Sequence, residues 1–361
     1  GAEYTLSAAP AIEADLLGRD LTINALAKGT DGRLVGAPQA LEDLRGGILR
    51  PVALQNFFDD PLRVMRAARF SALFPEFQID PALEDAMRQV GASGRLADLS
   101  AERVGNEVRA AMAGPRPANF LRLLAANGAL SPWFEEWRPA DAIPAGPPAH
   151  HDGSVLDHTL EVMDRLAGAP LAVWMGLCHD MGKLTSDPDK LPSHHGHEIR
   201  GEDMALSLGE RLRLPQRYIR AGAAAARWHM TAGRYSQLRA GTKVDLLLNL
   251  RRFKLVPEME SLVAADKPGV AVGRMVEVAL RGLGLEGHPK TSGATGLHIY
   301  VPLEPVHSYG AVRKVVETIG RLIVSADPTL ATMEWDIPKR VGKVFIDHNQ
   351  NVGGKTIASV Y

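Results

Sequence analysis

The sequence has 361 residues, of which 45% are hydrophobic and 23% are charged, and its formal net charge at pH 7 is -1. This length suits two or three globular domains, and the near-zero charge excludes a strongly basic protein, so a nucleic-acid partner would need local basic surfaces. Cys178 is the only cysteine, which excludes an internal disulfide. No run of about 18 apolar residues and no basic-then-apolar leader is present, so we expect no membrane partner and a cytoplasmic location.

Residues 1–52 contain strand-like pieces at 33–35 and 48–52 and a helical pattern at 22–27. The chain does not begin with Met, and we expect its N-terminus to be incomplete. The phrase GRDLTINA starts at Gly18, and its Arg, Asp, Thr and Asn side chains lie opposite an apolar face. Such polar groups suit a polyphosphate or ribose, and a helix N-terminus capped by Asp20 is the alternative.

A second phrase, FDDPLRVMRAARF, covers residues 58–70. Pro61 suits the first turn of a helix that Asp59 or Asp60 caps. Arginines then recur every three residues on one face without matched acids, at Arg63, Arg66 and Arg69. This pattern predicts a surface that faces an anion, and a solvated arginine face is the alternative. Residues 81–137 continue with helical patterns, and the Pro-rich residues 141–148 indicate a linker.

The apolar run that starts at Leu171 ends abruptly at His179 and Asp180. An unpaired charge at the buried end of a helix costs several kcal/mol, and a divalent cation would offset that cost. His179 and Asp180 therefore form a candidate metal site. Further candidates lie on both sides of this pair, at His158, His194, His197, His229 and Asp266.

Beyond residue 284 the pattern changes to a glycine-rich turn that enters an alternating strand, a helix from about 309 to 324 and a strand at 343–347. Small residues beside Ser292 and His298 would let a phosphate approach backbone N–H groups, and Asp347 at a strand end is a candidate metal ligand. A small α/β cap that packs on the preceding module is the alternative.

Four phrases, RDLTINALA, ALEDLRGGILR, DDPLRVMRAARF and AERVGNEV, occur in the order typical of class II tRNA nucleotidyltransferases, the CCA-adding enzymes, which this sequence resembles. The resemblance implies that Arg19 and Asp20 hold a nucleotide and that tRNA is a partner. It also implies that Asp60 and Arg63 read the base edges of CTP and ATP, with Arg66 and Arg69 near the triphosphate.

The sequence departs from this family pattern in three ways. Gly18 stands where the family often has Arg, and Asp59 stands where it usually has Glu. The residues before Gly18 contain no Asp-x-Asp pair, whereas nucleotidyl transfer requires two carboxylate-held metals. We therefore expect an N-terminally truncated head that transfers no nucleotide by itself.

The histidines and aspartates resemble the ligand set of the HD phosphohydrolase superfamily. The resemblance implies that His158, His179, Asp180 and Asp266 bind a divalent Mn, Ni, Co or Mg ion and that His179 and Asp180 are central to catalysis. The remaining residues would support these ligands or bind a second metal: His194, His197 and His229. Some bacterial CCA-adding enzymes carry such a domain, which implies phosphatase and 2′,3′-cyclic phosphodiesterase activity.

The last residues, which include KVFIDHNQNVGGKTIA, resemble the primase-like polymerase domain of bacterial DNA ligase D. The resemblance implies that Ser292 and His298 contact a triphosphate, that Asp347 binds metal and that this piece contacts DNA. The Asp-x-Asp pair of that family is absent from residues 270–285 directly upstream, which have the pattern of a helical linker.

We therefore expect a mainly α, multi-domain protein with incomplete α/β pieces at both ends. The expected parts are a nucleotidyltransferase remnant, a helical nucleotide-recognition neck, a linker, an HD domain and an α/β fragment: residues 1–52, 53–140, 141–149, 150–284 and 285–361. The expected activity is metal-dependent phosphoester hydrolysis. The alternatives are a non-catalytic tRNA- or nucleotide-binding remnant and a fusion with a DNA end-joining polymerase fragment.

Overall fold

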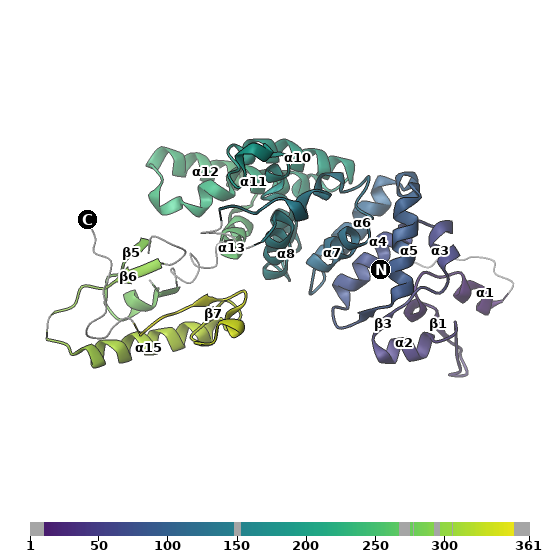
Figure 1. The fold of residues 1–361 in the computed structure, drawn as a ribbon, viewed down its shortest axis with the longest axis horizontal. Helices are drawn as coiled ribbons and strands as arrows, with labels where there is room; N and C mark the ends of the chain where they lie inside the picture. Colours follow the sequence, from purple (N-terminus) through teal and green to yellow (C-terminus); the bar gives the residue numbers. More distant parts are fainter. Residues whose placement is uncertain are drawn as a thin grey trace.

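The computed structural model describes residues 11–147, 153–266, 275–276, 278–291, 297–304 and 306–349. The fold is mainly α-helical with short two-stranded sheets, as expected from the sequence. In Figure 1 the helices form an elongated array, with α1 to α3 near one end and α15 with the last strands near the other. No helix among the described residues is both long and apolar enough to cross a membrane.

The N-terminal piece is small and irregular. Its elements are α1 (Ile12–Leu17), the 3-10 turn η1 (Thr22–Asn24), β1 (Leu26–Lys28), β2 (Leu34–Gly36), α2 (Ala40–Gly46) and β3 (Ile48–Leu49). β1 and β2 pair antiparallel, with Leu26 opposite Gly36. The helix expected at 22–27 is therefore only one 3-10 turn, because pairing with β2 draws residues 26–28 into a strand.

A helical layer follows this piece. It contains α3 (Leu54–Asp59), α4 (Leu62–Leu73), β4 (Gln78–Ile79), α5 (Pro81–Ala92), η2 (Arg95–Asp98), α6 (Ala101–Met112), α7 (Ala118–Ala126), η3 (Glu135–Trp137) and η4 (Ala140–Ala142). Asp80 and Ser100 cap α5 and α6 through backbone N–H groups, a common N-terminal arrangement. α4 packs against α6 and α7, and β3 pairs parallel with β4.

The third part is a helical bundle. It contains α8 (Val155–Arg165), α9 (Pro170–Cys178), η5 (Met181–Thr185), η6 (Pro188–Lys190), α10 (His197–Arg211), α11 (Gln216–Gly233), η7 (Tyr235–Gln237), α12 (Ala240–Arg252) and α13 (Val256–Asp266). α9 is apolar on all sides and lies against α8, α11 and α13. One hydrophobic core runs from the layer of α3 to α7 into this bundle, so both parts share buried side chains such as Met65, Leu124 and Val173.

The last part has a core of its own. Its elements are β5 (His288–Thr291), β6 (Leu297–Tyr300), α15 (Tyr309–Ala326), β7 (Ala331–Thr332), η8 (Ile337–Arg340) and β8 (Val344–Phe345). The helix expected at about 309–324 is confirmed, and the strand expected at 343–347 is shorter. β5 pairs antiparallel with β6, and β7 pairs parallel with β8.

Candidate functional site

Side chains from five segments meet inside the helical bundle. His158 lies in the first turns of α8, and His179 and Asp180 follow the end of α9. The other members come from α10, α11 and the last residue of α13: His197, His229 and Asp266. The apolar α9 is packed on all sides, so the residues that directly follow it lie in the interior of the bundle. His179 and Asp180 are 0% and 2% exposed.

The first group of donors surrounds His158 and His179. His158 Nε2 lies 3.0 Å from Asp266 Oδ1 and 3.2 Å from His179 Nε2. Asp180 Oδ2 lies 3.1 Å from His179 Nε2 and 3.5 Å from His158 Nε2. These are the separations expected of donor atoms that share one ion at bond lengths of about 2.1 Å.

The second group lies on the other side of the same carboxylate. Asp180 Oδ1 is 3.4 Å from His229 Nε2 and 3.5 Å from His197 Nε2. Asp180 thus directs one oxygen to each group. The structure brings together six of the seven residues singled out in the sequence and places them in two clusters able to hold a metal.

Hydrogen bonds to the backbone fix the orientation of three imidazole rings. His179 Nδ1 donates to Gly176 O at 2.7 Å. His197 Nδ1 donates to His194 O at 2.8 Å, and His229 Nδ1 donates to Ala225 O at 2.9 Å. Because a carbonyl oxygen only accepts, each Nδ1 carries a proton, and a ring without a second proton presents a lone pair at Nε2. The three Nε2 atoms face the carboxylate of Asp180.

Lone pairs that face a carboxylate in a buried site repel each other unless a cation or a proton lies between them. Asp180 Oδ1 and His197 Nε2 are buried and have no hydrogen-bond partner among the described residues. Both observations fit a divalent cation with imidazole and carboxylate ligands.

The pKa values of the cluster follow from burial and charge. Burial raises the pKa of Asp180, but His179 and Lys183 outweigh burial and hold the pKa well below its usual range. Burial lowers the pKa of His179, but Asp180 and Asp266 outweigh burial and raise it. Burial also lowers the pKa of His197, which favours its neutral, ligand-competent form.

Lys183 belongs to the site but was not among the residues singled out from the sequence. Its Nζ lies 2.8 Å from Asp180 Oδ2 and donates to Ala145 O at 2.7 Å. The available signal was its position three residues after Asp180, which places both side chains on one helical turn. Lys183 therefore supplies a positive charge to the cluster and ties it to the segment that precedes α8.

His194 does not join either cluster. Its Nδ1 lies 2.7 Å from Ser186 Oγ, and its Nε2 lies 2.8 Å from Pro144 O. Both ring nitrogens are therefore engaged elsewhere, although the carbonyl of His194 orients His197.

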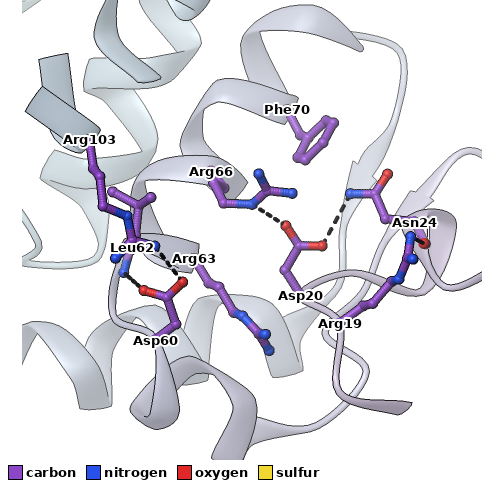
Figure 2. A pocket seen from close by; sticks show the side chains of 9 residues that line it. All are labelled: Arg19, Asp20, Asn24, Asp60, Leu62, Arg63, Arg66, Phe70 and Arg103. Carbon is purple, nitrogen blue, oxygen red and sulfur yellow. Dashed lines mark hydrogen bonds and ion pairs between the residues drawn. The ribbon is translucent and has the colours of Figure 1, made fainter. Parts of the chain in front are cut away.

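A separate pocket of about 430 Å³ lies where residues 19–24 meet α4 and α6. Figure 2 shows its lining, which includes the expected residues Arg19, Asp20, Asp60, Arg63 and Arg66. The remaining lining residues are Asn24, Leu62, Phe70 and Arg103. The structure thus brings together two phrases that lie about forty residues apart in the sequence.

For Arg66 and Arg69, the expectation of arginines without matched acids is wrong. Arg66 pairs with the buried Asp20 at 2.6 Å, and Arg69 pairs with Glu107 of α6 at 3.0 Å outside the pocket lining. Burial raises the pKa of Asp20, but the charge and hydrogen bond of Arg66 outweigh burial and lower it. The acids come from distant parts of the chain, so helical spacing did not reveal them.

The two residues expected to read a base are also engaged. Asp60 Oδ2 lies 2.7 Å from Arg103 Nη2, and Arg63 donates to Gly18 O at 2.6 Å. In Figure 2 the side chains of Asp60 and Arg63 border the same space. Arg19 pairs with Asp15 at 2.8 Å and is half exposed.

The C-terminal candidates lie apart from these sites. Ser292 lies outside the described residues. His298 is on β6, and Asp347 follows β8 and accepts a hydrogen bond from the N–H of Asn349. Among the described residues, neither His298 nor Asp347 belongs to a group of three side chains that could hold a metal ion.

Three family models match the chain. The HD domain matches residues 155–265, and the probable RNA and SrmB-binding site of polymerase A matches residues 76–141. The LigD primase-polymerase domain matches residues 263–361. The HD match covers all the metal-site candidates of the bundle except Asp266, which directly follows its last residue.

The chain is similar to proteins named multifunctional CCA protein. It is 36% identical over 259 residues to that of Thioalkalivibrio sulfidiphilus, covering 70% of this chain and 63% of the relative. It is 35% identical over 339 residues to that of Alkalilimnicola ehrlichii, covering 91% of this chain and 79% of the relative. The chain thus spans less than two thirds of the first of these relatives. A solved structure of the Bacillus stearothermophilus CCA-adding enzyme in complex with CTP is 22% identical, with a TM-score of 0.45 over 88% of this chain and 71% of that chain.

Proposed function

Because this chain belongs to the multifunctional CCA protein family, we propose that its buried His–Asp cluster binds divalent metal and hydrolyses phosphoesters. The observation that carries the proposal is the Asp180 carboxylate, whose two oxygens face lone pairs of imidazole rings that backbone carbonyls hold in place. The substrates that we propose are 2′,3′-cyclic and terminal phosphates of nucleotides or RNA ends.

We assign His158, His179, Asp180 and Asp266 as ligands of one ion. Asp180, His197 and His229 would hold a second. Mixed imidazole and carboxylate donors suit Mn, Ni, Co or Mg. When bound, the ion would lower the pKa of a water molecule and stabilise charge that develops on the phosphate.

Hydrogen bonds within the protein orient the side chains that would bind the metal. The carbonyls of Gly176, His194 and Ala225 keep three imidazole rings in one tautomer, so no rearrangement is required when a cation arrives. Lys183 balances one carboxylate charge. Burial keeps the donors away from bulk water, which strengthens their electrostatic interactions.

Hydrolysis of 2′,3′-cyclic AMP tests this proposal. The purified chain is loaded with Mn, Ni, Co or Mg in turn, and its metal content is measured beside its activity. Asp180→Asn keeps the size of the side chain but removes the charge that both groups share, so it should lose bound metal and at least about a hundredfold in rate.

Asp203→Asn is the matched control, because Asp203 is an exposed residue of α10 in the same bundle. It should retain both metal and activity. A wild-type chain that binds metal but hydrolyses none of these phosphates, or an Asp180→Asn chain as active as wild type, would contradict the proposal.

A second candidate function, nucleotide binding, is favoured by the pocket of Figure 2. Asp60 and Arg63 offer an acceptor and a donor fork for a base edge, and Arg19 and Arg66 offer positive charge for a triphosphate. We propose CTP and ATP as ligands, which calorimetric titration of the purified chain measures.

The division of labour that we propose follows the sequence. Residues 1–52 and 53–140 bind nucleotide, the segment 141–149 leads into residues 150–284, which hydrolyse, and tRNA is the partner of both. Residues 285–361 are proposed as an α/β fragment that contacts DNA, because the primase-polymerase family model matches this part of the chain.

A further inference from the structure

Asp266 lies at the end of a helix that disfavours its charge. It is the last residue of α13, its side chain is 7% exposed, and its Oδ1 lies 3.0 Å from His158 Nε2. The C-terminal end of a helix carries partial negative charge and carbonyl groups without partners in the helix. A buried carboxylate at this end is repelled by both, so its position depends on contacts from neighbouring elements.

Arg165, the last residue of α8, supplies such a contact. Its Nη1 donates to Ala265 O at 3.0 Å, and Ala265 is 6% exposed. A charged donor makes a strong hydrogen bond to a buried carbonyl and places positive charge at the negative end of α13. Nη2 of the same guanidinium donates to Glu161 Oε2 at 2.9 Å, which fixes the direction of the fork. The end of α13 is thus tied to α8 through its backbone.

α8 braces the end of α13 through two side chains. His158 and Arg165 are about two turns apart, so they lie on one face of α8, about 10 Å from each other along its axis. They converge on Asp266 and Ala265, which are neighbours in the chain. Figure 1 shows α8 and α13 beside each other, and the two helices are in contact. Contacts from two directions restrict rotation of the helix end, which a single contact would allow.

We propose that Arg165 is a positioning residue, which holds the end of α13 so that the Asp266 carboxylate reaches the ion bound by His158 and His179. The inference rests on the proposed metal site. Backbone carbonyls orient three imidazole rings of the cluster, and Arg165 has the corresponding role for Asp266, with donor and acceptor exchanged. Removing a group that orients a metal ligand typically lowers metal affinity about 10- to 100-fold.

Arg165→Met tests the proposal because it keeps a long apolar stem and removes every donor. The carboxylate of Glu161 loses its partner, but this side chain is 58% exposed, so water solvates it and the variant buries no unpaired charge. Arg165→Lys is the conservative variant, since it keeps a positive charge and a donor for Ala265 O. It should restore most of what Arg165→Met loses.

Arg217→Met is the matched control. Arg217 of α11 also contacts α13, at 2.9 Å from Glu258 Oε1, but near the start of the helix rather than beside Asp266. The side chain of Glu258 is only 20% exposed, so the control leaves the more buried carboxylate unpaired. It should therefore cost at least as much stability as Arg165→Met.

Binding of Co²⁺ is measured by calorimetric titration, together with the visible absorption spectrum of the bound ion. Arg165→Met should bind one ion about 10- to 100-fold more weakly. It should also change the spectrum, because the geometry of bound Co²⁺ depends on its ligands. Arg217→Met should keep the wild-type affinity and spectrum.

Hydrogen exchange of the metal-free proteins reports on the helix end itself. Backbone amides of residues 263–266 should exchange at least about tenfold faster in Arg165→Met than in wild type, the effect of losing one hydrogen bond from a charged donor. In Arg217→Met their exchange should match wild type.

Wild-type Co²⁺ affinity and spectrum in Arg165→Met would overturn the proposal, as would unchanged exchange at residues 263–266. Equal weakening by Arg165→Met and Arg217→Met would also overturn it, because general destabilisation would then explain the loss. Hydrolysis of 2′,3′-cyclic AMP is measured on the same proteins. A wild-type chain that binds Co²⁺ without hydrolysis would remove the proposed hydrolase function and leave the role of Arg165 standing, whereas a wild-type chain that binds no ion would overturn both.

Discussion

At the scale of single residues, the bundle buries carboxylates whose charge would be costly to bury without a compensating positive charge. Asp180 and Asp266 are carboxylates in the interior of the bundle, and Lys183 is the only lysine that contacts them among the described residues. The Nδ1 protons of three imidazole rings are committed to backbone carbonyls, so without a second proton these rings add acceptors rather than charge. The cluster is thus short of positive charge, which a divalent cation would supply.

Arg63 carries a prediction at the same scale. If its planar fork reads the edge of cytosine, Arg63→Lys keeps the charge but loses the paired donors. Affinity for CTP, measured by calorimetric titration, should then fall by about tenfold, within the 1–3 kcal/mol expected for a bidentate contact. Arg45→Lys, at an exposed arginine of α2, is the control and should bind like wild type. Equal affinity of all three proteins would place CTP elsewhere.

At the scale of elements, one close contact joins the turn that carries Asp180 to the helix that carries His197. Gly182 in η5 lies directly against the first turn of α10, and a Cβ on Gly182 would lie 1.9 Å from His197 O and 2.6 Å from Gly201 N. Neither atom belongs to a flexible side chain. The distance of 3.5 Å between Asp180 and His197 therefore depends on the absence of a side chain at Gly182.

Gly182→Ala should force η5 and α10 apart. We expect a loss of about 1–3 kcal/mol in the free energy of unfolding, the usual cost of overpacking, together with reduced metal content. Gly241→Ala in α12 is the control, since a Cβ there meets nothing within 4 Å and should be neutral or stabilise by up to about 1 kcal/mol. Chemical denaturation and metal analysis of the two variants decide the matter; a Gly182→Ala protein with wild-type stability and metal content would refute this account.

The sequence predicted these elements unevenly, for physical reasons. The apolar run of α9 and the spacing of His158, His179 and Asp266 located the metal-site candidates, because hydrophobic pattern and residue type are both visible in one dimension. The partners of Arg66 and Asp60 were not visible, since Asp20 and Arg103 lie 46 and 43 residues away from them. The backbone carbonyls that orient the imidazole rings have no sequence signal at all.

At the scale of the whole molecule, the described residues form one large hydrophobic core and two small ones, around Leu16 and in the C-terminal part. The main core continues from the layer of α3 to α7 into the bundle, so the nucleotide pocket and the His–Asp cluster share one packed body. The C-terminal core is small and centres on Leu280, Ile319, Ile323 and Ala331. Exposed apolar side chains surround it, including Trp335, Ile337 and Val341.

Separate cores predict separate unfolding. A small core stabilises its fold only marginally, so the C-terminal part should melt first and the main body later, as two calorimetric transitions. Ile319→Ala should abolish or lower the first transition alone, because a buried Ile→Ala change costs about 2–5 kcal/mol. A chain shortened to residues 1–274 should keep only the second transition and retain its metal, since Asp266 and the other cluster residues remain. A single transition that Ile319→Ala shifts as a whole would instead mean that the two cores fold as one cooperative unit.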